Sequence, residues 1–145
     1  MNNFSTNELL YIKTSTSEQL STDCVYTHYS YSLPYSIHKV LNYYLKLHFK
    51  TLELQTEYAK RMLKINKLIP IYINPQVILF PIKQKRAPIQ YYINARQIIG
   101  INVKRNITII NFNNAISLEV DEPHTLIMKK CQESLILSQL ITQTI

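Results

Sequence analysis

Four polar residues between two prolines are the strongest candidates for a chemical role in this chain of 145 residues. Pro81 and Pro88 flank residues 83–86, which read KQKR, within the segment LFPIKQKRAPIQYYIN. Proline fixes φ and cannot donate to a strand ladder, so residues 83–86 are expected to form a stiffened loop between strands. Long cationic side chains on such a loop can reach phosphates or enter a narrow minor groove, where the potential is most negative.

Two later connections of the same predicted sheet supply further cations, and an amide in the loop can hydrogen-bond to base edges. The complete set of predicted DNA-binding residues is Lys83, Gln84, Lys85, Arg86, Arg96, Lys104 and Arg105. The alternative is that these charged residues only keep a surface loop solvated and bind nothing. If residues 83–86 and 104–105 share one exposed face, DNA is favoured; a large apolar face elsewhere favours a protein partner.

The distribution of charge supports a polyanionic partner. Sixteen Lys and Arg against nine Asp and Glu give a net charge of +7 and an isoelectric point near 9.4. Residues 39–105 hold thirteen of the basic residues and two of the acidic ones. Such a basic middle attracts nucleic acid first and an anionic membrane second. An AT-biased coding sequence, which yields many lysines, is the alternative explanation.

The sequence holds no arrangement typical of an enzyme or a metal site. Its single glycine excludes the glycine-rich loops that cradle phosphates in nucleotide-binding proteins. Cys24 and Cys131 form no CxxC pair, and the histidines lack the spacing of zinc ligands, so we predict reduced thiols and no metal. Glu119, Asp121 and Glu122 have no base or nucleophile beside them and are expected to flank a helix start. No catalytic residue and no cofactor are predicted.

The N-terminal and apolar segments do not resemble export or membrane signals. The start, MNNFSTNELLYIK, lacks a basic region followed by a long apolar run. The longest apolar stretches, such as VILFPI, are far shorter than the roughly 20 residues that cross a bilayer. A cytoplasmic protein without membrane contact is predicted.

Tyrosine is abundant, with eleven residues that include the adjacent pairs Tyr43-Tyr44 and Tyr91-Tyr92. In each pair one ring is expected to face inward and its neighbour outward. An exposed tyrosine beside cations can stack on single-stranded bases. Aromatic residues on strands more commonly belong to the core, so a stacking role is the weaker interpretation.

The first half of the chain is expected to contain strands and then two helices. β-rich residues predict strands at 8–12 and 20–31. Pro34 then opens a helical pattern, with Ser32 as its expected cap. A second helix is expected at 53–66, with inward-facing Leu54, Tyr58, Met62 and Ile65. Its cations, which include Lys60 and Lys64, are interpreted as a solvated face.

Six short β-branched runs follow, and the polar turns between them predict an antiparallel meander. The runs occupy residues 69–73, 77–82, 89–94, 98–103, 107–112 and 115–120. Asn113 and Asn114 are expected to adopt positive φ in the last hairpin, before a helix at 124–142. The predicted fold is α+β: one domain over 1–145, with an antiparallel meander sheet made chiefly from 69–120, two helices before it and one closing C-terminal helix.

From roughly residue 54 to 140 the chain resembles the ComK competence transcription factors of Gram-positive bacteria. The resemblance rests on KINKLIPIYIN, VILFPIKQKRAPIQYYIN and ITIINFNNAISLEV, and on a following helix like PHTLIMKKCQESLILSQLI. These segments match the family's P-I-x-I strand, its F-P strand with a basic loop and a strand ending I-N, and its apolar hairpin. The segment KTLELQTEYAKR departs from the family, which commonly carries a glycine there.

The resemblance implies a transcription activator that binds AT-rich DNA in the minor groove and assembles as an oligomer. Longer members continue into a C-terminal tail implicated in activation and in adaptor-mediated proteolysis, whereas this sequence stops at Ile145. The expected partners are double-stranded AT-rich DNA, further copies in a homo-oligomer or a related regulator in a hetero-oligomer, and a proteolytic adaptor.

Three functions stay open at this point. The leading hypothesis is a DNA-binding regulator of competence genes. The first alternative is a short, non-activating relative that oligomerises with a full-length regulator and modulates it. The second alternative is an RNA-binding or generally basic protein. A gel-shift comparison of AT-rich with GC-rich duplexes distinguishes the first from the others.

Overall fold

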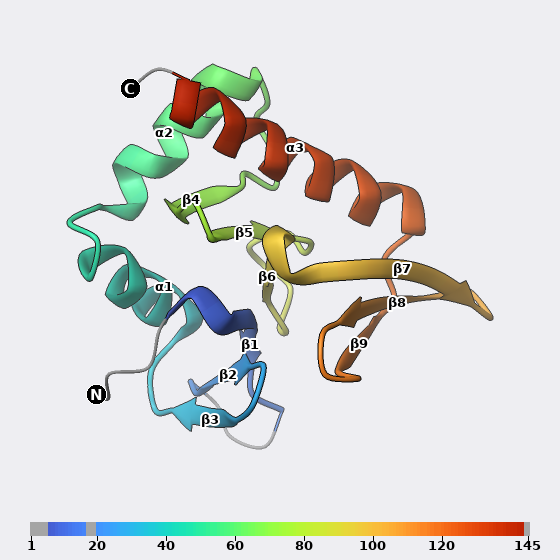
Figure 1. Cartoon of the computed structure of the whole chain (residues 1–145). Helices are drawn as coiled ribbons and strands as arrows, with labels where there is room; N and C mark the ends of the chain where they lie inside the picture. The colour runs from blue at the N-terminus through green and yellow to red at the C-terminus, as the bar shows by residue number, and fades with distance from the viewer. Residues whose placement is uncertain (1–5, 17–19, 144–145) are drawn as a thin grey trace.

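The computed structural model describes residues 6–16 and 20–143, which form two antiparallel sheets, three α-helices and two short 3-10 helices (Figure 1). In chain order the elements are η1 (Thr6–Glu8), β1 (Leu9–Thr14), β2 (Thr22–Tyr26), β3 (Ser30–Leu33), α1 (Ile37–Lys46), α2 (Leu52–Leu63), β4 (Ile71–Asn74), β5 (Val77–Pro81), β6 (Tyr91–Asn94), η2 (Ala95–Gln97), β7 (Ile98–Lys104), β8 (Ile107–Phe112), β9 (Ser117–Val120) and α3 (His124–Gln143). The predicted α+β class, with antiparallel strands and a closing C-terminal helix, is confirmed.

The strands divide between a larger and a smaller sheet. The larger sheet has the order β3-β2-β1-β6-β5-β4, and the smaller one has the order β7-β8-β9. Strand β1 lies between β2 and β6, which places Tyr11 opposite Ile93. Six of the nine strands come from residues 69–120, as predicted, but the three N-terminal strands form half of the larger sheet. The single meander was therefore an incomplete description of the pairing.

The start of α1 differs from the predicted one. Ser36, rather than Ser32, caps the helix, and its hydroxyl accepts a hydrogen bond from the backbone N–H of Lys39 at 3.3 Å. Ser32 belongs to β3, where its hydroxyl donates to the Asp23 carboxylate at 2.6 Å. Because β3 pairs with β2 as far as Leu33, the chain stays extended there and the helix begins later.

The buried face of α2 is also displaced from the predicted one. Leu54 is 63% exposed and Tyr58 is 37% exposed, whereas Ala59 is fully buried beside Leu137 of α3. A small side chain at this point lets α2 approach β4 and α3 closely, so the larger residues lie at the edges of the contact. Met62 packs against the same cluster, as predicted.

Two apolar clusters bury most of the larger sheet. One joins α1 to the strands through buried residues that include Leu9, Ile12, Val40, Leu41 and Tyr44. The other joins the smaller sheet and α3 to the strands through residues that include Phe80, Ile93, Phe112, Leu118 and Ile127. The strands are thereby fixed by packing, and the connections at their ends project from this scaffold (Figure 1).

Asn94, at the end of β6, fixes the strands on either side of it. Its fully buried amide donates hydrogen bonds to the carbonyl oxygens of Leu9 at 2.8 Å and Gln76 at 3.2 Å. Its side-chain oxygen accepts hydrogen bonds from the backbone N–H groups of Ile78 at 3.2 Å and Arg96 at 3.1 Å. Both donors and both lone pairs of the amide are used, so an asparagine at the end of this strand satisfies four backbone groups.

A buried lysine joins α3 to the segment between α2 and β4. Lys130 is 5% exposed, and its ammonium group donates to the carbonyl oxygen of Lys67 at 3.0 Å and to the carboxylate of Glu133 at 2.8 Å. A buried ammonium group is stable only when it is paired in this way. This basic residue therefore has a structural role and does not belong to the exposed positive surface.

Candidate nucleic-acid interface

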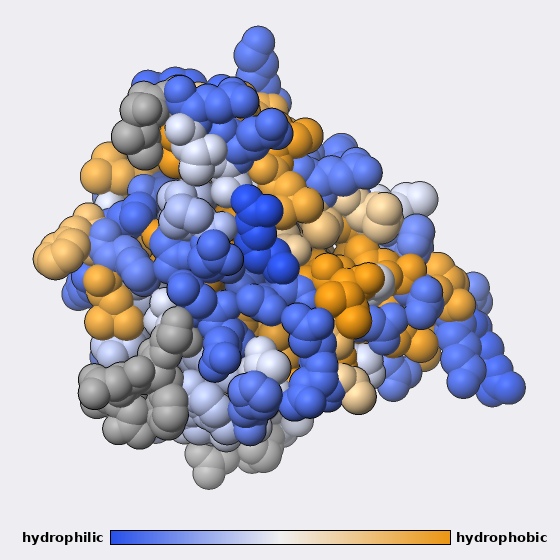
Figure 2. Space-filling view, viewed as in Figure 1, coloured by the Kyte–Doolittle hydropathy of each residue, from blue (hydrophilic) through white to orange (hydrophobic). Residues whose placement is uncertain are grey.

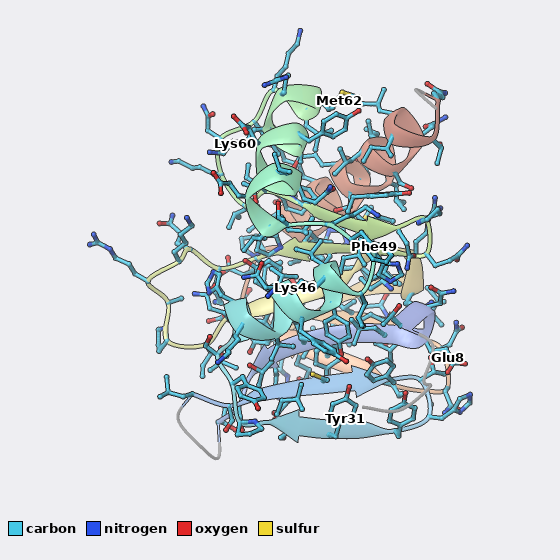
Figure 3. The ribbon with its side chains drawn as sticks, turned by 90° about the vertical axis from the view of Figure 1, so that its left-hand side faces the viewer. Glu8, Tyr31, Lys46, Phe49, Lys60 and Met62 are labelled. Atoms are coloured by element: carbon cyan, nitrogen blue, oxygen red, sulfur yellow. The ribbon has the colours of Figure 1, made fainter. Side chains whose placement is uncertain are left out.

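The loop between β5 and β6 is fixed by hydrogen bonds within itself. It projects at the left-hand side of the view in Figure 3. The side-chain amide of Gln90, which is 7% exposed, donates to the carbonyl oxygens of Gln84 at 2.6 Å and Ala87 at 2.9 Å. The backbone N–H of Ala87 also donates to Gln84, at 3.0 Å. Together with the flanking prolines, these bonds give the loop a defined shape, as its sequence predicted.

Lys83 is held by two carboxylates and does not project freely. Its ammonium group lies 2.5 Å from the Asp121 carboxylate and 2.7 Å from the Glu122 carboxylate. Burial lowers the pKa of Lys83, but the hydrogen bonds and charges of the two acids outweigh it and raise the pKa. The hydrogen bond and charge of Lys83 lower the pKa of Asp121. Asp121 and Glu122 precede α3 as expected, but their observed partner is this loop.

Lys85 and Arg86 are the exposed cations of the loop. Within the described residues, no carboxylate lies within ion-pair distance of either side chain. Gln84 is exposed as well, while its backbone carbonyl binds Gln90. The loop therefore presents three polar side chains outward and uses Lys83 as its anchor.

Shallow grooves lie on both sides of this loop, and both contain acids. On the helical side, Lys85 and Lys60 line a groove together with Glu53 and Glu57 of α2. On the other side, an open groove of about 500 Å³ separates the loop from the smaller sheet and is lined by Lys83, Ala87, Pro88, Ile89, Tyr91, Ile107, Glu119, Val120 and Asp121. Because of these carboxylates, the positive surface lies on the projecting side chains rather than inside the grooves.

The β7–β8 hairpin carries the second group of predicted cations. Arg105 and Asn106 form its turn with φ of 51° and 67°, the left-handed pair that a two-residue hairpin loop requires. Lys104 and Arg105 are both exposed at the tip, which projects to the right in Figure 1. Ile107, next to this tip, lines the groove beside the loop, so the hairpin and the loop border the same groove.

Arg96 is separated from the other predicted residues. It lies in η2, at the end of β6 opposite to the loop and at the start of β7 opposite to the hairpin tip. Its guanidinium donates to the carbonyl oxygen of Pro75 at 3.1 Å and to the hydroxyl of Ser138 at 3.3 Å. Among the predicted residues, Lys83 lines the groove between the loop and the hairpin, Lys85 lines the groove on the helical side, and Arg96 lies apart from both.

The two cysteines are free thiols with no sign of reactivity. Cys24 is buried, which raises its pKa to about 11, and Cys131 is half-buried with a pKa that burial also raises. Both are therefore protonated at neutral pH. The described part of the chain contains no group of three His, Cys, Asp or Glu side chains that could hold a metal ion.

The tyrosine pairs divide between core and surface. Tyr44 is buried and its hydroxyl lies 2.6 Å from that of Tyr26, while Tyr43 is half-buried. Tyr92 is buried in the larger sheet, and Tyr91 borders the groove beside the loop.

Across residues 6–16 and 20–143, no helix has the length and apolar character needed to span a membrane.

Comparison of the sequence with models of protein families identifies the family of this basic α+β protein. A family model described as ComK protein matches residues 5–145, which is nearly the whole chain. The chain therefore belongs to the ComK family, a family of competence transcription factors. No curated protein and no solved structure matches the chain.

Proposed function

We propose that this protein is a regulator of competence genes that binds AT-rich duplex DNA, with Lys85 and Arg86 as its central contacts. The supporting observation is that these two cations are exposed and unpaired among the described residues, on a loop whose shape Gln90 and Lys83 maintain. A preorganised loop loses less conformational entropy on binding than a mobile one. Residues 1–145 act as one DNA-binding domain in this proposal.

The remaining predicted residues take different roles. Lys104 and Arg105 contact phosphates on the far side of the shared groove, and Gln84 bonds to base edges. Lys83 positions the loop through its two carboxylate partners. Arg96 contributes at most a peripheral phosphate contact, because its guanidinium is engaged by Pro75 and Ser138.

The minor groove of AT-rich DNA is the proposed binding surface. A narrow minor groove has an enhanced negative potential that attracts inserted arginine side chains. Arg86 is therefore the residue expected to determine sequence preference. A small molecule that occupies the AT minor groove should displace the protein, whereas blocking the major groove should have little effect.

The test is a Lys85→Ala, Arg86→Ala variant titrated with AT-rich and GC-rich duplexes at several salt concentrations. Each neutralised phosphate contributes about 0.9 to the slope of log K against log salt, so the slope should fall by roughly 2. Lys129→Ala, which removes an exposed cation from α3, is the matched control. A folded double variant with an unchanged slope and affinity would remove the loop from the binding surface.

A second candidate is modulation of a longer related regulator through direct association. It is favoured by the apolar surface over β7, where Ile99 is 65% exposed and Val103 is 58% exposed (Figure 2). In this alternative the chain binds DNA weakly by itself. Ile99→Ser with Val103→Ser should then abolish co-purification with the longer regulator, while the DNA affinity of the chain alone stays the same.

A further inference from the structure

Phe49, in the connection between α1 and α2, is 99% exposed. The connection ends α1 with two backbone hydrogen bonds, from Lys50 to the carbonyl of Leu45 at 3.0 Å and from Phe49 to that of Lys46 at 3.1 Å. This is the Schellman arrangement, in which the residue at the position of Phe49 has a left-handed conformation and is commonly glycine. Phe49 has φ of 58° there.

Neither feature of Phe49 stabilises the folded chain. The left-handed conformation is unfavourable for a residue with a Cβ, and the ring remains in water. Among the large hydrophobic residues of the described chain, Phe49 has the highest exposed fraction. An aromatic ring held away from the protein surface by a fixed backbone turn is suited to a contact outside the molecule.

The charge around Phe49 selects the kind of partner. Residues 37–67 contain seven basic residues and two acidic ones. Figure 3 shows Lys46 and Lys60 on the same face of α1 and α2 as Phe49. Lys50 lies in the connection itself, with its ammonium group 5.7 Å from the centre of the Tyr72 ring. A second copy of this basic surface would be repelled, whereas a polyanion is attracted.

We propose that Phe49 is an apolar wedge that inserts its ring between adjacent base pairs of duplex DNA. This inference rests on the proposed DNA-binding function and adds a contact that the basic loop does not make. Proteins that bind the minor groove use phenylalanine and other apolar side chains in this way, and the inserted side chain unstacks one step and kinks the duplex. TA steps, which occur in AT-rich DNA, are among the easiest to unstack.

The cations near the wedge hold the duplex against it. Lys46 is exposed in the last turn of α1 and contacts the phosphates beside the unstacked step. Insertion between base pairs removes the Phe49 ring from water. The free energy of this burial is gained only when the protein binds DNA, because the ring is exposed in the free protein. Affinity for a stiff duplex without TA steps should therefore be lower than affinity for a flexible AT-rich one.

The test uses AT-rich duplexes in which 2-aminopurine replaces adenine at a TA step, because unstacking of this base raises its fluorescence. The full chain should increase the fluorescence, and Phe49→Ala should abolish the increase and weaken binding about tenfold. Phe49→Leu should retain part of both effects, since leucine also serves as a wedge. Leu47→Ala, which changes a neighbouring residue that is 48% exposed, should behave like the unaltered chain.

Each result has a defined consequence. If the unaltered chain binds the duplex without raising the fluorescence, or if Phe49→Ala is unchanged in both measurements, the wedge is refuted and the proposed function stands. If Phe49→Ala alters sedimentation of the free protein while its DNA binding is unchanged, Phe49 is a protein contact and the wedge is refuted. If the unaltered chain does not bind duplex DNA at any salt concentration, both proposals fail.

Discussion

The loop between β5 and β6 and the connection between α1 and α2 both project from the scaffold, but they are built differently. Three side chains from two places shape the loop: Gln90 within it, and Asp121 and Glu122 directly after β9. At the end of α1, backbone hydrogen bonds close the turn at Phe49, while the neighbouring His48 and Lys50 contact Asn74 and Tyr72. The shape of the loop therefore depends on side chains, whereas the turn at Phe49 keeps its backbone hydrogen bonds whatever side chain residue 49 carries. Fixed cations suit recognition of a regular phosphate path, and a free ring suits insertion.

The largest effect is expected where the strands that carry the loop are joined. Asn94→Asp places a carboxylate oxygen against the carbonyl oxygens of Leu9 and Gln76. It should lower the free energy of unfolding by about 3–5 kcal/mol, because two carbonyl oxygens lose their donor and face a buried negative charge instead. Urea denaturation followed by circular dichroism measures this change. Asn102→Asp, at an exposed position of β7, should stay within about 0.5 kcal/mol of the unaltered chain.

The next effect concerns the shape of the loop rather than its charge. Gln90→Ala removes the two hydrogen bonds that close the loop and should destabilise the protein by about 1–2 kcal/mol. DNA affinity should fall although Lys85 and Arg86 are still present, because the loop must then be ordered on binding. Titration at one salt concentration tests this. Equal affinity would mean that loop shape is irrelevant to binding.

Lys83→Met removes the ion pairs that hold the loop and leaves the exposed cations Lys85 and Arg86 in place. It should lower stability at neutral pH by about 1–2 kcal/mol and leave the salt slope of DNA binding almost unchanged. The pKa of Asp121 is lowered from 3.8 in the fold, so the ion pair stabilises above that value and is lost as pH falls through the folded pKa. The pKa of Lys83 is raised from 10.5, so the contribution is also lost as pH rises through its folded value.

The variant and the unaltered chain should therefore differ most between these two limits and converge in acid. Unfolding curves at pH 7 and at a series of pH values below 3.8 make the comparison. A difference that stays constant across this range would show that the ion pairs of Lys83 do not account for the change in stability.

The smallest effect is expected at the end of α1 and has the opposite sign. Phe49→Gly should raise the free energy of unfolding by about 0.5–1 kcal/mol, because glycine adopts the left-handed conformation without a Cβ and the ring makes no buried contact. Thermal unfolding measures the change. A loss of stability would mean that the ring packs on the protein in solution.

Local patterns in the sequence were sufficient to locate most elements. Each of the six β-branched runs between residues 69 and 120 overlaps an observed strand, and the closing helix begins at His124. The asparagine turn was half correct, since Asn114 and Ala115, rather than Asn113, have positive φ. These features depend on neighbouring residues, which is why period and turn composition reveal them.

Contacts between residues far apart in the sequence could not be predicted from local patterns. The pairing of β1 with β6 and the ion pair between Lys83 and Asp121 join residues that are far apart in the sequence. No local pattern distinguishes an anchored lysine from a free one. The inward face of α2 was misplaced because Ala59, a weak hydrophobic signal, packs more closely than the leucine and tyrosine beside it.

The central position of β1 has a consequence for synthesis on the ribosome. Strand β1 emerges early with β2 beside it, but the partner for its other edge, β6, follows about 80 residues later. At about 5–20 residues per second, that edge waits roughly 4–16 seconds before β6 has been translated. During this interval the nascent chain exposes an apolar strand edge, which is a template for aggregation. Slow codons between α2 and β6 should therefore lower the yield of folded protein more than slow codons after β6.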